Sequence, residues 1–295
     1  MSSKVLTPPR SFNFAAHLLA ANTGWPDRIA FTDDHGSLGY GALGEQVRRC
    51  AAALLAAGIK REERVLLLMH DCVEWPICFL GAIYAGIVPV AVNTLLTVDD
   101  YAYMLEHSRA QAALVSGALL PALREAMGKG GAHEVKAIVV VHPAGQLQAG
   151  EQEFHAFVDA HPPMAQPAST GCDDPGFWLY SSGSTGKPKG TVHSQANPYW
   201  TCELYAKGVL RMRDDDICFS AAKLFFAYGL GNALTFPMSV GASVLLMAER
   251  PTPAAVFKRL RGQVGGVRPT ILYGAPTGYA GMLAAPDLPL KGEVS

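Results

Sequence analysis

The chain has 295 residues, of which 49% are hydrophobic, so it is long enough for one large domain or two ordinary ones with an extensive core. Its 24 basic and 25 acidic residues nearly cancel, which argues against a nucleic acid or an anionic membrane as the main partner. Any site for an anion must therefore be local.

The sequence favours a cytoplasmic protein. Its N-terminal residues contain two prolines and no apolar core, unlike a secretory signal. The longest apolar stretch, residues 79–92, is too short to span a bilayer and contains Pro89. The cysteines form no CxxC pair and no Cys/His cluster at zinc spacing, so we expect small buried side chains in a reducing compartment; they are Cys50, Cys72, Cys78, Cys172, Cys202 and Cys218.

The first half of the chain alternates helical and strand signals. Helical periodicity over residues 43–57 ends at Gly58 and is followed by a buried strand at 64–69. Strands that are apolar on both faces and alternate with helices predict an α/β fold with parallel sheets covered on both sides. Further helices are expected at 73–86, 98–107 and 119–127, and further strands at 88–92, 112–116 and 137–141.

Residues 141–174 are richer in Pro, Gly, Gln and His and predict a surface connection with at most one short helix. This connection separates a first expected α/β subdomain, residues 1–160, from a second, residues 170–295. In the second, strands are expected at 177–180, 190–193, 216–221, 243–247 and 270–274, and helices at about 198–210, up to about 238, at 253–261 and at 276–284.

The stretch YSSGSTGKPKG, residues 180–190, is unlike a core or a linker. Residues 181–186 are only Ser, Gly or Thr, so successive backbone N–H groups can turn inward as a nest for an anion, while the hydroxyls add donors. Lys187 and Lys189 add mobile positive charge. A flexible linker shares this composition, but here an apolar strand precedes the loop and another strand candidate follows it. The stretch therefore predicts a polyphosphate site.

A Walker-type P-loop also follows a strand and also contains Gly-Lys. That motif reads G-x-x-x-x-G-K, whereas two residues separate Gly183 from Gly186. A Walker loop leads into a helix whose N-terminus faces the phosphates, but Pro188 and Gly190 interrupt here and the following residues have an extended pattern. The loop therefore predicts a nucleotide site of a different design.

The same stretch closely resembles the phosphate loop of the adenylate-forming enzymes, which include acyl- and aryl-CoA ligases, firefly luciferase and the adenylation domains of peptide synthetases. Residues 78–96 and 224–247 resemble two further motifs of that family, in the same order and spacing. The resemblance covers essentially the whole chain. It implies stacked mixed and parallel sheets with helices on both faces, as in the N-terminal large domain of such an enzyme.

Members of this family activate a carboxylate in two steps. The carboxylate attacks MgATP to give an acyl-adenylate and pyrophosphate, and in the CoA ligases a thiol then displaces AMP. The resemblance thus implies ATP, Mg²⁺ and coenzyme A as cofactors, a small aryl carboxylate as substrate, and a Thr185 hydroxyl close to the metal. It places the phosphates against Ser181, Ser182, Gly183, Ser184, Thr185, Gly186 and Lys187, with Lys189 supporting the far side of the loop.

Residues 189–200 and 223–238 resemble the benzoate–CoA ligase subgroup rather than the long-chain fatty acid ligases. This implies that Phe226 is an aromatic gate near the adenylate and the thiol channel, and that Ala227 and Tyr228 form a wall of the carboxylate pocket, where a flat ring can stack. From composition alone, the start of a core helix is the simpler interpretation of these aromatic residues. Gln195 stands where many relatives have a histidine, with His193 two positions earlier, so the role of that histidine is not carried over.

Three other features carry weaker signals. Lys223 could meet a carboxylate, although an ordinary exposed lysine is the simpler expectation. Residues 271–279 resemble the strand and helix beside the acid pocket of relatives and are expected to be scaffold. The acidic residues 214–216, in front of a strand, indicate a solvated turn rather than a metal site.

The later motifs of the family are absent, including the adenine, Mg²⁺ and ribose segments, the hinge and the C-terminal catalytic lysine, and members are about twice as long. We therefore expect the N-terminal part of a longer enzyme, lacking the C-terminal lid domain and a poor catalyst by itself. The expected parent enzyme converts benzoate, ATP and CoA to benzoyl-CoA, AMP and pyrophosphate. The alternatives are a non-catalytic module for nucleotide or acyl-adenylate, a structural subdomain that binds nothing, and a ligase for another aryl or alicyclic acid. The oligomeric state is open.

Overall fold

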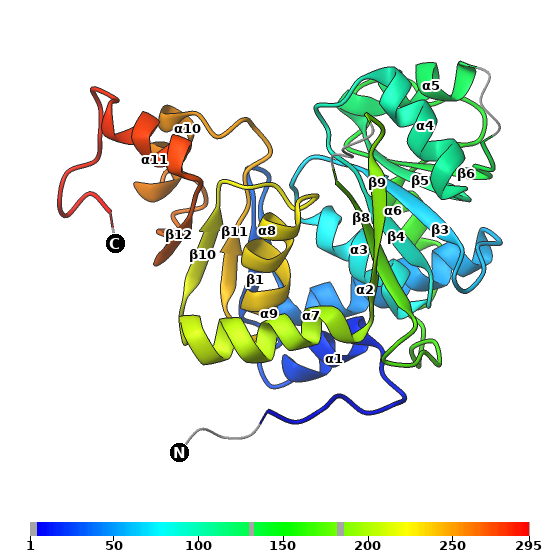
Figure 1. Cartoon of the computed structure of the whole chain (residues 1–295), viewed down its shortest axis with the longest axis horizontal. Coiled ribbons are helices and arrows are strands. Elements are labelled where there is room, and N and C mark those ends of the chain that lie inside the picture. The colour runs from blue at the N-terminus through cyan, green and yellow to red at the C-terminus, as the bar shows by residue number, and fades with distance from the viewer. Residues whose placement is uncertain (1–4, 130–132, 182–185, 295) are drawn as a thin grey trace.

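Two β-sheets form the framework of residues 5–129, 133–181 and 186–294, which are the residues that this computed structural model describes (Figure 1). Pairing is parallel except between β8 and β9 and between β1 and β2. The seven-stranded sheet has the order β7 (Glu151–Glu153), β6 (Ala137–Val141), β5 (Ala112–Ser116), β3 (Arg64–Leu68), β4 (Val88–Ala91), β8 (Pro175–Ser181) and β9 (Lys189–Ser194). The five-stranded sheet has the order β12 (Ile271–Tyr273), β10 (Ile217–Ser220), β11 (Ser243–Leu245), β1 (Ile29–Thr32) and β2 (Ser37–Gly39).

Helices cover the faces of both sheets and fill the space between them. Figure 1 shows α4 and α5 beside the seven-stranded sheet on one side of the molecule, and α10 and α11 beside the five-stranded sheet on the other. The helices are α1 (Phe14–Ala21), α2 (Tyr40–Ala56), α3 (Glu74–Tyr84), α4 (Val98–Ser108), α5 (Leu120–Gly128), α6 (Phe154–Asp159), α7 (Ala196–Thr201), α8 (Ala227–Leu230), α9 (Phe236–Val240), α10 (Pro253–Leu260) and α11 (Pro276–Leu283), with a 3₁₀ turn η1 (Gly117–Leu119) and π-helical segments η2 (Cys202–Leu210) and η3 (Gly231–Thr235).

Alternation along the strands divides the core into layers. In β3, Val65 and Leu67 face the central core that contains α2 and α3, whereas Leu66 and Leu68 face a second core under α4 and α5. A third core lies between the outer face of the five-stranded sheet and α10. Because the inner strands β3, β4 and β5 are buried on both faces, they read as continuous apolar runs. The predicted α/β class, with mixed sheets and helices on both faces, is confirmed.

Four elements were not predicted, namely α1, β1, β2 and β7. The strand β7 has the sequence Glu-Gln-Glu and lies at the edge of its sheet beside β6, so it has no apolar run that a sequence pattern could detect. The strands β1 and β2 have four and three residues. Strands this short are fixed by their tertiary pairing rather than by a local pattern; here β1 pairs with β11, and β2 pairs with β1.

The two sheets cut across the division expected between residues 1–160 and 170–295. The strands β1 and β2, from the first forty residues, join the sheet built from β10, β11 and β12, while β8 and β9 join the sheet of the first half, beside β4. The two expected subdomains stay a prediction, and each half of the chain contributes strands to the sheet of the other.

The helix α4 begins at a capping box. The Thr97 hydroxyl accepts a hydrogen bond from the Asp100 amide at 3.3 Å, and the Asp100 carboxylate accepts one from the Thr97 amide at 3.0 Å. Such reciprocal bonds satisfy two of the free N–H groups at a helix start. They also fix the helix turn that carries Asp100, which lies at the candidate site described below.

A buried arginine joins α10 to the loops that follow β1 and β11. The Arg259 side chain is 0% exposed, and its guanidinium pairs with Asp34 and with Glu249, each at 2.6 Å, and donates to the Leu246 carbonyl at 3.3 Å. The two carboxylates are partly exposed, so the pairs keep some solvation while the arginine has none. Removing the guanidinium would leave these loops without their shared partner.

We predict that Arg259→Ala lowers the free energy of unfolding by about 2–4 kcal/mol, because it opens a cavity and breaks a buried charge network. The control Arg213→Ala removes an arginine that is 70% exposed and pairs with exposed Asp215, and it should cost less than about 0.5 kcal/mol. Denaturant unfolding of the purified protein measures both. Equal, small losses in the two variants would show that the Arg259 network does not stabilise the fold.

Candidate active site

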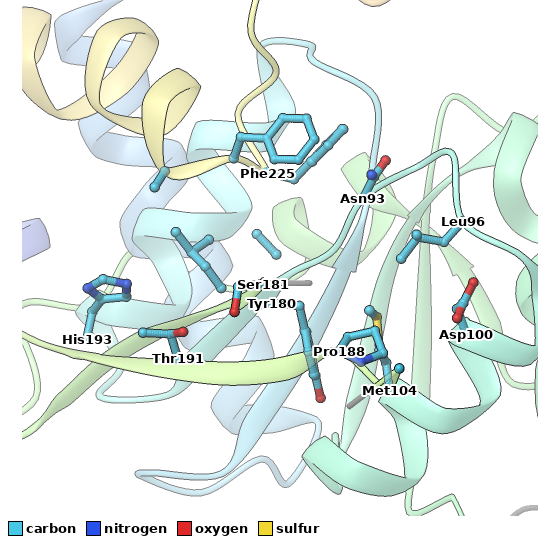
Figure 2. A pocket seen from close by; sticks show the side chains of 15 residues that line it. Asn93, Leu96, Asp100, Met104, Tyr180, Ser181, Pro188, Thr191, His193 and Phe225 are labelled. Atoms are coloured by element: carbon cyan, nitrogen blue, oxygen red, sulfur yellow. The ribbon is translucent and has the colours of Figure 1, made fainter. Parts of the chain in front are cut away.

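A cavity of about 680 Å³ lies where β4, α4, the β8–β9 hairpin and the segment before α8 meet (Figure 2). It stands at the carboxyl ends of parallel strands β4 and β8, the usual place for a ligand in an α/β sheet. Figure 2 shows Thr191 and His193 on one side and Leu96 and Asp100 on the other. The lining residues are Ala91, Asn93, Leu96, Asp100, Met104, Leu179, Tyr180, Ser181, Gly186, Pro188, Thr191, His193, Phe225, Phe226 and Ala227.

The predicted phosphate loop borders this cavity at both of its described ends. Ser181 ends β8, and Gly186 has a φ of +89°, a conformation that favours glycine. Ser182, Gly183, Ser184 and Thr185 lie outside the described residues, and with them the hydroxyl predicted to lie close to the metal. The described residues on either side of this gap, Ser181 and Gly186, thus both lie at the cavity, and the phosphate-binding role of the loop stays a prediction.

Residues of α4 contact the far side of the loop. The Lys187 ammonium lies 4.9 Å from the centre of the Tyr103 ring, and the Tyr103 hydroxyl donates to the Pro188 carbonyl at 3.2 Å. An ammonium over an aromatic face is attracted by the ring quadrupole. Lys189 pairs with Ser181 across the hairpin and is exposed. Neither lysine is among the lining residues.

A tyrosine–histidine pair links β8 to α4 beside the cavity. The Tyr180 hydroxyl lies 2.8 Å from His107 Nδ1. Burial raises the pKa of Tyr180 above its ordinary value, and the neighbouring Tyr103 adds to this shift. The phenol is therefore neutral at physiological pH and can act as a hydrogen-bond donor.

A smaller apolar pocket of about 130 Å³ adjoins the cavity and shares Leu179, His193 and Ala227 with it. The His193 ring stacks on Phe177 with centroids 4.7 Å apart, and burial lowers the pKa of His193, which favours the neutral imidazole. The other lining residues come from β8, α7 and the π-helical region; they are Phe177, Asn197, Pro198, Thr201, Leu230, Gly231, Thr235 and Phe236.

The Phe225–Phe226 pair separates the cavity from a second one of about 670 Å³, because both residues line both cavities. Their ring centroids lie 4.6 Å apart; Phe225 is 4% exposed and Phe226 is 46% exposed. Composition alone favoured a core helix start for this segment, yet Phe226 borders open space while α8 begins one residue later. The predicted gate position of Phe226 fits this geometry and stays a prediction.

Two of the predicted pocket residues, Ala227 and Tyr228, lie in different surroundings. Ala227 lines both the cavity and the small apolar pocket. Tyr228 is absent from the lining of both in the described part of the chain; it is half exposed, its ring lies edge-on to Tyr273, and its hydroxyl is 3.5 Å from the Gly274 carbonyl. Its place in a carboxylate pocket stays a prediction.

The expectation of an ordinary exposed Lys223 was wrong. Its side chain is only partly exposed, and its ammonium donates to the carbonyls of Glu249, at 2.6 Å, and Met247. Burial lowers the pKa of Lys223, while the negative charge of Asp71 acts in the opposite direction. The lysine is directed into the fold because the carbonyl groups that follow β11 are its hydrogen-bond acceptors. No sequence pattern indicates these partners.

The acidic residues 214–216 form the predicted turn. Asp216 accepts a hydrogen bond from the Arg213 amide at 2.8 Å and from the Thr270 hydroxyl at 2.9 Å. In the ranges that the structure covers, no group of three or more His, Cys, Asp or Glu side chains is arranged to hold a metal ion. Residues 271–279 form β12 and the start of α11, as expected for scaffold.

Gln195 connects the hairpin to the N-terminal helix. Its side chain is buried, and its Oε1 accepts a hydrogen bond from the Phe14 amide at 2.8 Å. This bond lies at the start of α1, away from the cavity lining. The glutamine at this position thus has a structural partner, and the residue that faces the cavity is His193.

Sequence reasoning missed Asn93, Asp100 and Thr191, which also line the cavity. Asn93 lies two residues after the end of β4, and the first polar residue after a buried apolar strand is a signal that could have identified it. Asp100 reads as a helix cap, and Thr191 as an ordinary strand residue. Their place at the cavity depends on how α4 and β9 pack.

Among the described residues, no helix is long and apolar enough to cross a bilayer. All six cysteines are free, and five of them are buried. This fits the expectation of small buried side chains.

Comparisons with known proteins extend these observations. The sequence model of the AMP-binding enzymes matches residues 18–294. Benzoate–CoA ligase of Thauera aromatica is 47% identical over 97% of this chain and 53% of its own length. The 4-hydroxybenzoate–CoA/benzoate–CoA ligase of Rhodopseudomonas palustris is 43% identical over 95% of this chain and 50% of its own.

Solved structures agree with the sequence relatives. A benzoate CoA ligase from Burkholderia xenovorans LB400 is similar with a TM-score of 0.87 and 51% identity, covering 96% of this chain and 54% of that one. The anthranilate CoA ligase AuaEII, in complex with anthranoyl-AMP, has a TM-score of 0.89 and 30% identity over 95% of this chain and 53% of that one. The chain spans about half the length of the curated relatives that it matches, and with its N-terminal-type α/β fold and phosphate loop it belongs to the AMP-binding, adenylate-forming enzyme family.

Proposed function

We propose that the whole protein is an ATP-dependent benzoate–CoA ligase that forms benzoyl-adenylate and then benzoyl-CoA, with release of pyrophosphate and AMP. One observation carries this proposal: a small apolar pocket opens onto the cavity that the phosphate loop borders, and the two share Leu179, His193 and Ala227. An aryl ring bound in the small apolar pocket would hold its carboxylate at the edge of the larger cavity. The proteins to which the chain is similar act on benzoate, 4-hydroxybenzoate and anthranilate.

The first half-reaction joins a carboxylate oxygen to the α-phosphorus of ATP and releases pyrophosphate. We infer that the loop from Ser181 to Lys187 grips the leaving phosphates and holds the phosphorus in line, since positioning and charge neutralisation are most of what such a transfer needs. ATP supplies the activated phosphorus. Mg²⁺ would be bound with the ATP phosphates, with the Thr185 hydroxyl as the proposed neighbour, and Lys189 would support the loop from outside.

The aryl pocket is expected to hold the acid by shape and by aromatic contact. Its walls are mostly apolar, and Ala227 is a small residue on the side shared with the cavity. The neutral His193 imidazole can donate a hydrogen bond to a carboxylate without the cost of burying a second charge. A wider acid would need the walls near Ala227 to move.

In the second half-reaction, the thiol of CoA attacks the acyl carbon of the adenylate and AMP leaves. We propose that the thiol arrives past Phe226, which borders both large cavities. The chain spans about half the length of the relatives that it matches, and we propose that this part alone is a poor catalyst. The free cysteines are consistent with a cytoplasmic location.

Acid-dependent ATP–pyrophosphate exchange by the product of the complete gene is the first test. Benzoate should support the fastest exchange, followed by 4-hydroxybenzoate and cyclohexanecarboxylate, because only a flat ring fits the small pocket well; octanoate should give about background exchange. Fastest exchange with an alicyclic acid would favour that alternative substrate. No exchange with any acid would favour a non-catalytic binding module.

A larger side chain at Ala227, in the wall that the pocket and the cavity share, should impair the use of the acid rather than the binding of ATP. Ala227→Leu should lower kcat/KM for benzoate by about 10–100-fold, since overpacking a close-fitting pocket costs roughly 1–3 kcal/mol. The KM for ATP should change less than about threefold. Ala56→Leu, on the exposed end of α2, is the matched control and should change neither. A uniform loss for both substrates in Ala227→Leu would place Ala227 outside the acid pocket.

The loop assignment predicts a split between half-reactions. Lys187→Ala or Thr185→Ala should slow benzoyl-adenylate formation by about 100-fold, the typical loss of one transition-state contact. Thioester formation from supplied benzoyl-adenylate should fall less than about fivefold, because no pyrophosphate leaves in that step. The exposed Lys60→Ala is the control. Equal losses in both half-reactions would contradict a loop that binds pyrophosphate.

A further inference from the structure

A buried carboxylate joins the two sheets next to the aromatic pair. Asp71 follows β3 of the seven-stranded sheet and is 3% exposed. Its Oδ1 accepts a hydrogen bond at 3.2 Å from the amide of fully buried Leu224, 153 residues later in the chain. Leu224 follows β10 of the five-stranded sheet and directly precedes Phe225. The bond therefore ties one sheet to the segment that the other sheet presents to the site.

The segment from Lys223 to Phe226 is a tight turn that is held on two sides. The Phe226 amide donates to the Lys223 carbonyl at 3.0 Å, which closes the turn. On the other side, a Cβ atom at Gly229 would lie 2.0 Å from the Lys223 carbonyl oxygen, so α8 packs directly on the turn and requires glycine there. Asp71 holds the Leu224 amide from the opposite sheet. The position of the Phe226 ring thus depends on three short contacts.

Lys223 supplies the positive charge that offsets Asp71. Its ammonium donates to the carbonyls of Met247 and Glu249, which fixes it in the fold, and its charge acts on Asp71 through the protein interior. A buried carboxylate without such a neighbour would be costly. The fold therefore maintains a charged group at this point although an apolar or amide side chain would be less expensive to bury.

We propose that Asp71 is a positioning residue: as a carboxylate it holds the Lys223–Phe226 turn and so sets where the Phe226 ring stands between the two large cavities. The inference rests on the proposed function, in which Phe226 borders both the adenylate and the path of the thiol. It extends that function to Asp71, which lines neither of the two cavities beside Phe226. It predicts that both half-reactions depend on Asp71.

The charge of Asp71 opposes folding stability at neutral pH. Burial raises the pKa of Asp71 to about 6, while Lys223 and the Leu224 amide act in the opposite direction. Because this value lies above the ordinary pKa of an aspartate, the folded protein binds the proton more tightly than the unfolded chain, so stability falls as pH rises from about 4 to about 6.

Other titratable groups surround the pair. His35, His70 and His142 line the same small cavity as Asp71, with Asp33 and Asp34 from the loop after β1. Glu249 and Arg259 act on Lys223 from the loop after β11 and from α10. Burial lowers the pKa of His70, and Lys223 lowers it further. The test must therefore separate Asp71 from His70.

The experiment compares Asp71→Ala and Asp71→Asn in the product of the complete gene, with Asp214→Ala and Asp214→Asn as matched controls at a half-exposed carboxylate. Asparagine keeps an oxygen that can accept a hydrogen bond from the Leu224 amide but loses the negative charge. Alanine loses both the acceptor and the charge. We expect kcat/KM for benzoate-dependent exchange to fall about tenfold or more in Asp71→Ala and about threefold in Asp71→Asn. Thioester formation from supplied benzoyl-adenylate should fall in parallel. The Tm of Asp71→Asn at pH 8 should equal or exceed that of the parent.

The pH dependence of activity distinguishes positioning by the Asp71 charge from a purely structural role, which would leave that dependence unchanged. Parent activity should fall below about pH 6, as Asp71 takes up a proton, and the profile of Asp71→Asn should lack this step. If the step persists in Asp71→Asn and disappears in His70→Gln, His70 is the titrating group and the proposal is overturned. Unchanged rates in both half-reactions of Asp71→Ala, or rates that fall only in proportion to a lowered Tm in Asp71→Asn, would overturn it as well.

Failure of the proposed function is recognised separately. If the parent protein shows no exchange with any acid, hydrogen–deuterium exchange of the peptide 221–230 decides the role of Asp71. Faster amide exchange there in Asp71→Ala, with parent behaviour in Asp214→Ala, supports the positioning contact. Parent-like exchange in Asp71→Ala would overturn the proposal regardless of activity.

Discussion

Parallel pairing of β8 against β4 is the contact on which the candidate site depends. It places Trp178 opposite Val90 and Leu179 opposite Ala91, so that the first residue of the predicted phosphate loop, Ser181, emerges at the same edge as Asn93. The two strands are far apart in sequence, because α4, β5, α5, β6, β7 and α6 lie between them. Without this register the loop would have no cavity beside it. The rest of the site is built around the edge that these two strands create.

The second sheet brings the aromatic segment to that edge. Its strand β10 ends at Ser220, and the turn that follows is fixed by contacts from both sheets, including the buried Asp71–Leu224 hydrogen bond. The segment then enters α8 and the π-helical η3, where a Cβ atom at Gly231 would lie 2.8 Å from the Phe236 ring. Glycine thus permits Phe236 to lie against the helix and line the small apolar pocket. The pocket thus combines large apolar side chains, such as Phe177 and Phe236, with close packing against the backbone at Gly231.

Buried charge is concentrated where the two sheets meet. Arg259 joins the loops after β1 and β11, and Lys223 and Asp71 lie near it at the carboxyl ends of β10 and β3. Charges in a dry interior are costly unless they are paired and hydrogen-bonded. Their effect here is to fix the loops that border the cavities, because each buried group has few alternative partners.

The sequence by itself determined the class of fold and the family to which the chain belongs. Continuous apolar runs such as residues 64–69 identify strands buried on both faces, and the run of Ser, Gly and Thr followed by Lys187 indicates a phosphate loop, because both patterns are local. Tertiary structure alone decided that β1 pairs with β11, that Lys223 is buried against carbonyl groups, that Tyr228 turns towards Tyr273, and that Asp71 reaches Leu224. These facts depend on partners more than a hundred residues apart or on the direction of a single side chain, and no local periodicity records either of them.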